Sequence, residues 1–206
     1  ILGLLFTPVL RNWEFFLASK KKKRLLFAEL KDCRIYLEEI ISIYFRLLAT
    51  LESSKDENDN VGKIPIPLIQ NFDLNFIIEF YKESLLLLTQ EQRLFLREVP
   101  AQLKMIKDYS ETFNNAVLNE KFYNTRNIRN IIWLSCHLHS ELGQLLKMKK
   151  KYNRTKSKDS IEVTKETLIS LNYSEADIES AKVLKSMLTD LERSNFSGKS
   201  SFQVPD

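Results

Sequence analysis

Glycine and proline are scarce in this sequence, whose 206 residues include only four glycines and five prolines. Tight turns depend on both residue types. The scarcity therefore disfavours a β-sandwich or a series of βαβ units, which need many turns, and favours long helices joined by few loops. It also leaves little from which to build a glycine-rich phosphate loop, and the HExxH and GxSxG motifs of hydrolases are missing. An enzyme is therefore not expected.

Cysteine and histidine are equally rare, with two residues of each. Cys33 and Cys136 lie within apolar stripes, which predicts two buried thiols in a reducing compartment and no disulfide bond. His137 and His139 point about 200° apart on a helix, so they cannot bind one metal ion together. Cys33, Cys136 and His139 could supply part of a zinc site, but a closed site needs a fourth ligand. We therefore expect His139 to be a core residue, and we expect no metal or cofactor.

The apolar residues that are present follow a helical period. Between residues 25 and 51 they recur at alternating spacings of four and three, which is a strong helix signal. A second apolar stripe alongside widens the face, which favours a helical bundle over the narrow seam of a two-stranded coiled coil. The residues of the first stripe are Leu26, Leu30, Cys33, Leu37, Ile40, Tyr44, Leu47 and Leu51.

Similar periodicity predicts four long helices, near residues 24–52, 73–99, 101–120 and 125–150. Because short connections favour antiparallel neighbours, we expect these helices to run up, down, up and down. The predicted fold class is all-α: an antiparallel four-helix bundle, preceded by a short apolar helix end and followed by a C-terminal helical pair.

The boundary between the second and third helices has more than one reading. Thr89 to Gln92 matches a capping box, so a helix could begin at Gln90, or the chain could run straight through. Pro100 is expected to end or kink the helix, because proline removes a backbone hydrogen bond. Ser174 to Asp177 is a second capping box, within the C-terminal pair. We place the boundary between the second and third helices at Pro100.

Composition divides the chain into five segments. They are an apolar and aromatic segment 1–19, the bundle 20–150, a basic linker 151–162, the helical pair 163–194 and a flexible tail 195–206.

The first segment has the order of residues found where a helix leaves a membrane. Residues 1–10 are uncharged, Trp13, Phe15 and Phe16 follow, and five cations occupy positions 20–24. This order is typical of a helix exit on the cytoplasmic side. Ten apolar residues cannot cross a bilayer, which takes about 20, but they could be the last turns of a longer transmembrane helix. The alternative is a short apolar helix buried against the bundle.

A second basic run, residues 147–158, carries seven positive charges and no negative charge. In an up-down bundle it would lie beside the first run, 20–24, while the acidic stretch 56–59 would lie at the other end. Lysine also suits a helix C-terminus, which would explain the second run alone. Together the two runs predict a polybasic collar for anionic lipid headgroups. The candidate membrane-surface residues are Trp13, Lys20, Lys21, Lys22, Lys23, Arg24, Lys147, Lys149, Lys150 and Lys151.

The order of an apolar stretch, aromatic residues, KKKKR, a heptad helix and the segment NFIIEFYKESLLL resembles small bacterial single-pass membrane proteins of unassigned function. In those proteins a helical bundle follows a juxtamembrane basic stretch. The resemblance covers roughly residues 1–150 and implies no catalytic residues.

These patterns predict a membrane-tethered cytoplasmic scaffold, sensor or assembly module that acts through contacts with a partner protein or a second copy. The alternative is a soluble helical protein that binds nucleic acid or another protein through its basic clusters. The lysines are bunched at the ends of predicted helices and are not interleaved with aromatic residues along one groove. That placement favours the membrane hypothesis over nucleic acid.

Overall fold

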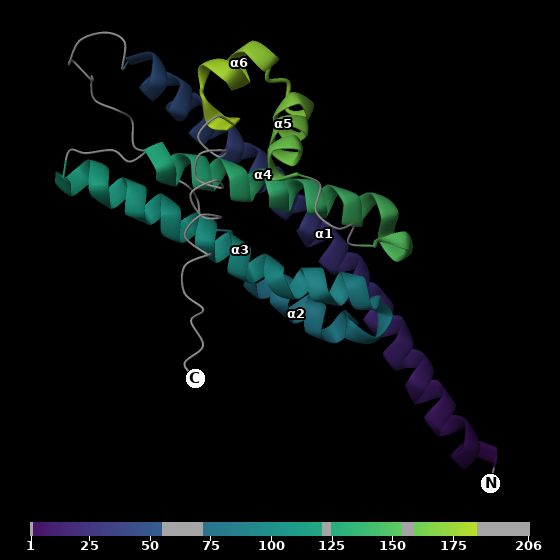
Figure 1. Ribbon diagram of the computed structural model, residues 1–206. Helices are drawn as coiled ribbons and strands as arrows, with labels where there is room; N and C mark the ends of the chain where they lie inside the picture. Colours follow the sequence, from purple (N-terminus) through teal and green to yellow (C-terminus); the bar gives the residue numbers. More distant parts are fainter. Residues whose placement is uncertain (1, 55–71, 121–124, 154–158, 185–206) are drawn as a thin grey trace, which may run out of the picture.

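The computed structural model describes residues 2–54, 72–120, 125–153 and 159–184, and the side chains within them except those of 2–10, 54, 119 and 120. Six α-helices pack together, and there is no strand in these ranges (Figure 1). The predicted all-α class is confirmed. The acidic stretch 56–59 and the tail 195–206 lie outside the described residues.

The first helix, α1, is one continuous helix of 53 residues, Leu2–Ser54. We expected a break between the apolar segment 1–19 and a helix that starts near residue 24. No break occurs because neither glycine nor proline lies between Val9 and Ser54, and Lys, Arg, Leu and Ala are strong helix formers. The basic run 20–24 therefore lies in the interior of a helix, where the dipole of a helix N-terminus does not act on it.

The boundary between the second and third helices is at Thr89 and not at Pro100. α2 (Asn75–Ser84) continues into a short 3-10 turn, η1 (Leu85–Leu87), and α3 spans Gln90–Asn115 with Pro100 inside it. The capping box decides the start of α3, because the Thr89 side chain accepts a bond from the backbone N–H of Gln92 and the Gln92 side chain accepts one from the backbone N–H of Thr89. The predicted end of the second helix at residue 99 and the predicted start of the third helix at residue 101 are therefore wrong.

α3 tolerates Pro100 because packing on both sides of it holds the helix. The buried residues of α3 continue through the proline at helical spacing: Phe95, Leu96, Val99, Leu103 and Ile106. A five-residue π-helical segment, η2 (Ala116–Glu120), ends this part of the chain.

α4 (Thr125–Met148) lies at the centre and packs against α1, α3 and α5 (Figure 1). It runs antiparallel to α1, since Glu38 of α1 meets His139 of α4 and Glu52, later in α1, meets Arg129, earlier in α4. A short 3-10 turn, η3 (Lys149–Lys151), follows α4.

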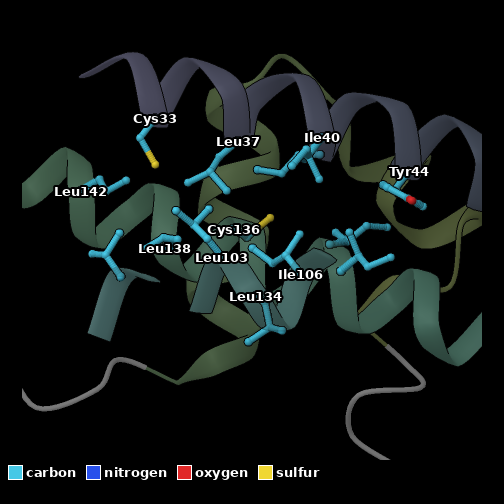
Figure 2. Close-up of a cluster of buried hydrophobic side chains, with 14 of the residues drawn as sticks. Cys33, Leu37, Ile40, Tyr44, Leu103, Ile106, Leu134, Cys136, Leu138 and Leu142 are labelled. Atoms are coloured by element: carbon cyan, nitrogen blue, oxygen red, sulfur yellow. The ribbon is translucent and has the colours of Figure 1, made fainter. Parts of the chain in front are cut away.

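The core forms where α1, α3 and α4 meet. Every residue of the stripe predicted from Leu26 to Leu51 is buried, with at most 7% of its surface exposed. Tyr44 adds a polar link, because its hydroxyl lies 2.6 Å from Ser110 Oγ and its ring meets Phe113 edge-on. Figure 2 shows the facing side chains, which include Cys33, Leu37 and Ile40 of α1, Leu103 and Ile106 of α3, and Leu138 and Leu142 of α4.

The C-terminal helices, α5 (Ser160–Ser170) and α6 (Glu175–Ser180), share this core. α5 begins at Ser160, inside the range predicted as a linker, and Ser174 caps α6 as predicted. The buried carboxylate of Glu52 links three elements, with Arg129 Nη2 2.8 Å from one oxygen and Lys182 Nζ 3.5 Å from the other.

Truncation of a core leucine tests this packing. Leu138 is fully buried, whereas Leu86 in η1 is 79% exposed. We expect Leu138→Ala to lower the free energy of unfolding by about 2–5 kcal/mol, because it removes buried surface and leaves a cavity. Urea unfolding followed by circular dichroism measures the change, and Leu86→Ala, the same substitution at the surface, should cost less than about 1 kcal/mol. Equal costs at the two positions would contradict the packing.

Candidate anion-binding site

The structure brings the first basic run, 20–24, and the described start of the second run, 147–153, together around one pocket. Its volume is about 340 Å³, and five of the six described residues that line it are cationic. Positions 20, 23, 24 and 27 of α1 share one helix face, because residues three and four apart are neighbours. Because α4 runs antiparallel to α1, the turn η3 that follows α4 lies beside this face of α1. The lining residues are Lys20, Lys23, Arg24, Phe27, Lys149 and Lys150.

The η3 side of the pocket is held by a buried glutamine. Gln92 has no exposed surface, and its Nε2 donates to the backbone oxygen of Lys149 at 2.8 Å, while its Oε1 accepts from Thr89 N at 3.0 Å. Tyr152, buried against the Phe95 ring, also donates its backbone N–H to the Lys149 oxygen. The start of α3 is thus tied directly to the basic turn.

Lys149 adopts a backbone conformation that few side chains favour. Its φ is +48°, in the left-handed region, which costs a residue other than glycine on the order of 1–3 kcal/mol. The bonds from Gln92 and Tyr152 to the Lys149 oxygen offset that cost. Lys149 and Lys150 therefore extend from a fixed turn and not from a loose chain end.

Lys23 is the half-buried cation of the pocket. Its ammonium donates to the backbone oxygen of Leu87 and lies 5.7 Å from the centre of the Phe27 ring. Burial lowers the pKa of Lys23, and the positive charge of Lys150 lowers it further. The pocket therefore holds cations close enough to repel one another.

The other four cations of the pocket, Lys20, Arg24, Lys149 and Lys150, are exposed. Among the described residues none of them forms an ion pair with a carboxylate. The pocket is consequently strongly positive and open to solvent. Chemically, such an arrangement can bind an anion.

Lys22, which the sequence also suggested as a surface contact, faces another way. Its Nζ lies 2.9 Å from Glu83 and 3.8 Å from Glu79, and it sits over the Phe80 ring of α2. The hydrogen bond to Glu83 raises the pKa of Lys22. Its charge is used to attach α2 to α1. Lys21, Lys147 and Lys151 are exposed and do not line the pocket.

Trp13, the remaining candidate, belongs to an exposed part of α1. Residues 11–18 are all exposed, including Trp13, Phe15, Phe16 and Leu17 at 61%, 59%, 45% and 47%. Figure 1 shows this end of α1 extending away from the other helices. The alternative in which the segment is buried against the bundle is therefore wrong for residues 11–18. No helix in the described part of the chain is both long and apolar enough to cross a membrane.

His139 and the two cysteines belong to the core, whereas His137 is half-buried. His139 is buried, as predicted, with Nε2 2.9 Å from Glu38 Oε1, and His137 Nε2 lies 3.2 Å from the backbone oxygen of Ser160. Cys33 and Cys136 are buried free thiols, and burial raises the pKa of Cys33 to about 12. Within the residues described, no three potential metal ligands come together.

Sequence analysis missed two residues of the site. Gln92 is visible in the sequence as half of a capping box, but nothing there shows that its free amide reaches Lys149. Phe27 is visible at the right spacing from Lys20 and Lys23, since positions i, i+3 and i+7 share a face. Only the contact of Gln92 with Lys149 required the tertiary structure to be recognised.

Removal of the Gln92 side chain tests whether it fixes the pocket. We expect Gln92→Ala to cost about 1–2 kcal/mol of unfolding free energy, because a helix cap and a buried hydrogen bond are lost. Limited trypsin digestion with mass spectrometry should also show faster cleavage after Lys149 and Lys150. The matched control is Gln90→Ala, an exposed glutamine in the same turn, which should change neither measurement. Unchanged cleavage in Gln92→Ala would contradict the role of this residue.

The two histidines should make stability depend on pH. Burial lowers the pKa of both His137 and His139 below the ordinary 6.5, although the bond from Glu38 partly counteracts this at His139, where nearby Arg34 lowers the pKa further. Below pH 6.5 the unfolded chain therefore binds protons that the folded chain does not. Stability should be complete above pH 6.5 and should fall as the pH decreases, by at most about 1.4 kcal/mol per pH unit for each histidine.

Urea unfolding between pH 7.5 and pH 5.5 measures how the free energy of unfolding changes with pH. Carboxylates titrate little in this range of about two pH units. The double variant His137→Gln/His139→Gln should flatten this pH dependence. A slope that persists undiminished in the double variant would assign the pH dependence to other groups.

No protein-family model, curated protein or solved structure matches this chain. The likeness to small bacterial single-pass membrane proteins stays a prediction, and the function is therefore inferred from the exposed start of α1 and the pocket beside it.

Proposed function

We propose that this protein is a helical scaffold or assembly module that stands on an anionic membrane surface, on the cytoplasmic side, with the start of α1 as its anchor. One observation carries the proposal: a cluster of exposed large apolar side chains on α1 is followed on the same helix by exposed cations, Lys20 and Arg24, which have no carboxylate partner among the described residues. The apolar cluster consists of Trp13, Phe15, Phe16 and Leu17.

The spacing along α1 suits a membrane interface. With a rise of 1.5 Å per residue, Trp13 and Lys20 are about 10 Å apart along the helix. Aromatic side chains favour the headgroup level of a bilayer, and basic side chains favour the anionic surface just outside it. Phe15, Phe16 and Leu17 point in successive directions around the helix, so lipid, which surrounds a helix, can cover all three.

The rigid architecture supports a scaffold role. α1 is about 80 Å long at 1.5 Å per residue, and it contacts α2, α4 and α6 along its length. At its far end, Glu52 joins α1 to Arg129 of α4 and to Lys182. A partner bound at that end would be held at a fixed distance from the membrane surface.

We also infer that α1 to α4 form an up-down bundle in which α2 is the short member. Lys22 near Glu83 and Tyr36 near Phe72 support an antiparallel α1 and α2. Two contacts support a parallel α1 and α3. Lys23, early in α1, donates to Leu87 just before α3 begins, and Tyr44, later in α1, contacts Ser110, later in α3.

A flotation assay with vesicles tests the anchor. The full chain should float with phosphatidylcholine vesicles that contain phosphatidylserine, and Trp13→Ala/Phe16→Ala should weaken binding at least about tenfold, because each buried aromatic side chain contributes about 1.5–3 kcal/mol. The control is Phe76→Ala/Met105→Ala, which removes two half-exposed apolar side chains from α2 and α3 and should leave binding unchanged.

Two results would contradict the membrane proposal. One is full binding by Trp13→Ala/Phe16→Ala. The other is the absence of vesicle binding together with duplex binding that weakens steeply as salt is added, which would identify a nucleic-acid-binding protein instead.

A further inference from the structure

We propose that the basic pocket binds a group that carries two or more phosphates on one small scaffold, such as a polyphosphorylated lipid headgroup or the corresponding free polyol phosphate. The inference deepens the proposed function: a lipid source rests on the membrane proposal, while a soluble source does not. It adds selection of a particular anion to a general attraction between charges.

The size of the pocket favours a ligand larger than a single ion. Its volume of about 340 Å³ falls within the range of about 300–1,000 Å³ that is usual for small-molecule sites. Phe27 provides apolar surface next to Lys23, against which the carbon skeleton of a polyol can pack. An isolated phosphate would leave this surface uncovered.

The number of charges favours more than one phosphate. Five cations line the pocket, and no carboxylate is among the described residues that line it. A phosphomonoester carries about −1.5 to −2 charges at pH 7, so two or three of them match five cations. A lipid headgroup with a net charge of about −1 would leave most of the pocket uncompensated.

The cations come from two elements that face each other. Lys20, Lys23 and Arg24 lie on α1, and Lys149 and Lys150 lie on η3. Gln92 fixes η3 at a distance that leaves Lys23 and Lys150 repelling one another. An anion between the two walls offsets that repulsion, and the hydrogen bonds to the Lys149 oxygen already hold the η3 wall in place.

The position of the pocket suits a headgroup. Its nearest residue, Lys20, lies about 10 Å along α1 from Trp13, and Phe27 lies about 21 Å from it, by helix rise. If the start of α1 enters the bilayer, a phosphorylated headgroup that projects from the surface reaches the pocket while its acyl chains stay beside Phe16 and Leu17.

The experiment compares two triple variants that remove the same charge. The pocket variant is Lys20→Ala/Lys149→Ala/Lys150→Ala, and the control variant substitutes alanine for the exposed neighbours that do not line the pocket, Lys21, Lys147 and Lys151. Circular dichroism and urea unfolding establish that both fold. Calorimetry measures binding of inositol trisphosphate and of inorganic phosphate, and flotation uses vesicles with phosphatidylinositol bisphosphate or phosphatidylserine at equal total charge.

We expect wild type and control to bind inositol trisphosphate within about threefold of each other, and the pocket variant to bind at least about tenfold more weakly, because charge-assisted hydrogen bonds to phosphate are lost. The same difference should appear on bisphosphate vesicles. On phosphatidylserine vesicles the two triple variants should weaken equally. Inorganic phosphate should bind much more weakly than the trisphosphate.

Three outcomes separate the pocket from the membrane proposal. Binding of the trisphosphate that depends on the pocket, without binding to any vesicle, supports the pocket with a soluble ligand and overturns the membrane proposal. Equal losses by both triple variants on every probe overturn the pocket and leave the membrane proposal intact. Inorganic phosphate that binds as tightly as the trisphosphate overturns the requirement for several phosphates.

Discussion

α1 and α4 pack against each other in antiparallel directions, and the register of this contact determines where every charged group of the two helices lies. Glu38 meets His139, and 14 residues further along α1, about 21 Å at 1.5 Å per residue, Glu52 meets Arg129. The buried stripe from Leu26 to Leu51 fixes that register, because sliding by one turn would place its side chains against the wrong gaps. The same register brings Lys23 to Lys150.

Two groups of cations among the described residues have different physical roles. Lys22, Arg129 and Lys165 each have a carboxylate partner on another helix, so their charges connect elements of the fold. Lys20, Arg24, Lys149 and Lys150 gather at one pocket without such a partner among the described residues. Like charges held together reduce stability unless an anion joins them, and the buried Gln92 holds them together.

Errors in the sequence-based expectations came from competition between local signals. Pro100 was expected to end a helix, yet the helix begins at the capping box of Thr89 and Gln92, which satisfies backbone N–H groups at its start. The helix continues through Pro100 because buried side chains on both sides of the proline hold it. The run 20–24 was expected to mark a helix start, although lysine propagates a helix well and nothing near it breaks one.

The sequence alone determined the all-α class, the buried face of α1, the capped start of α6 and the core position of His139, since each depends on periodicity or on residues a few positions apart. Only the tertiary structure decided that Lys20, Lys23 and Arg24 share a pocket with Lys149 and Lys150, that Lys22 turns to Glu83 instead, and that Gln92 reaches η3. These contacts join residues 57 or more positions apart, and the direction of a lysine or glutamine side chain depends on the helix packed beside it, which local pattern does not specify.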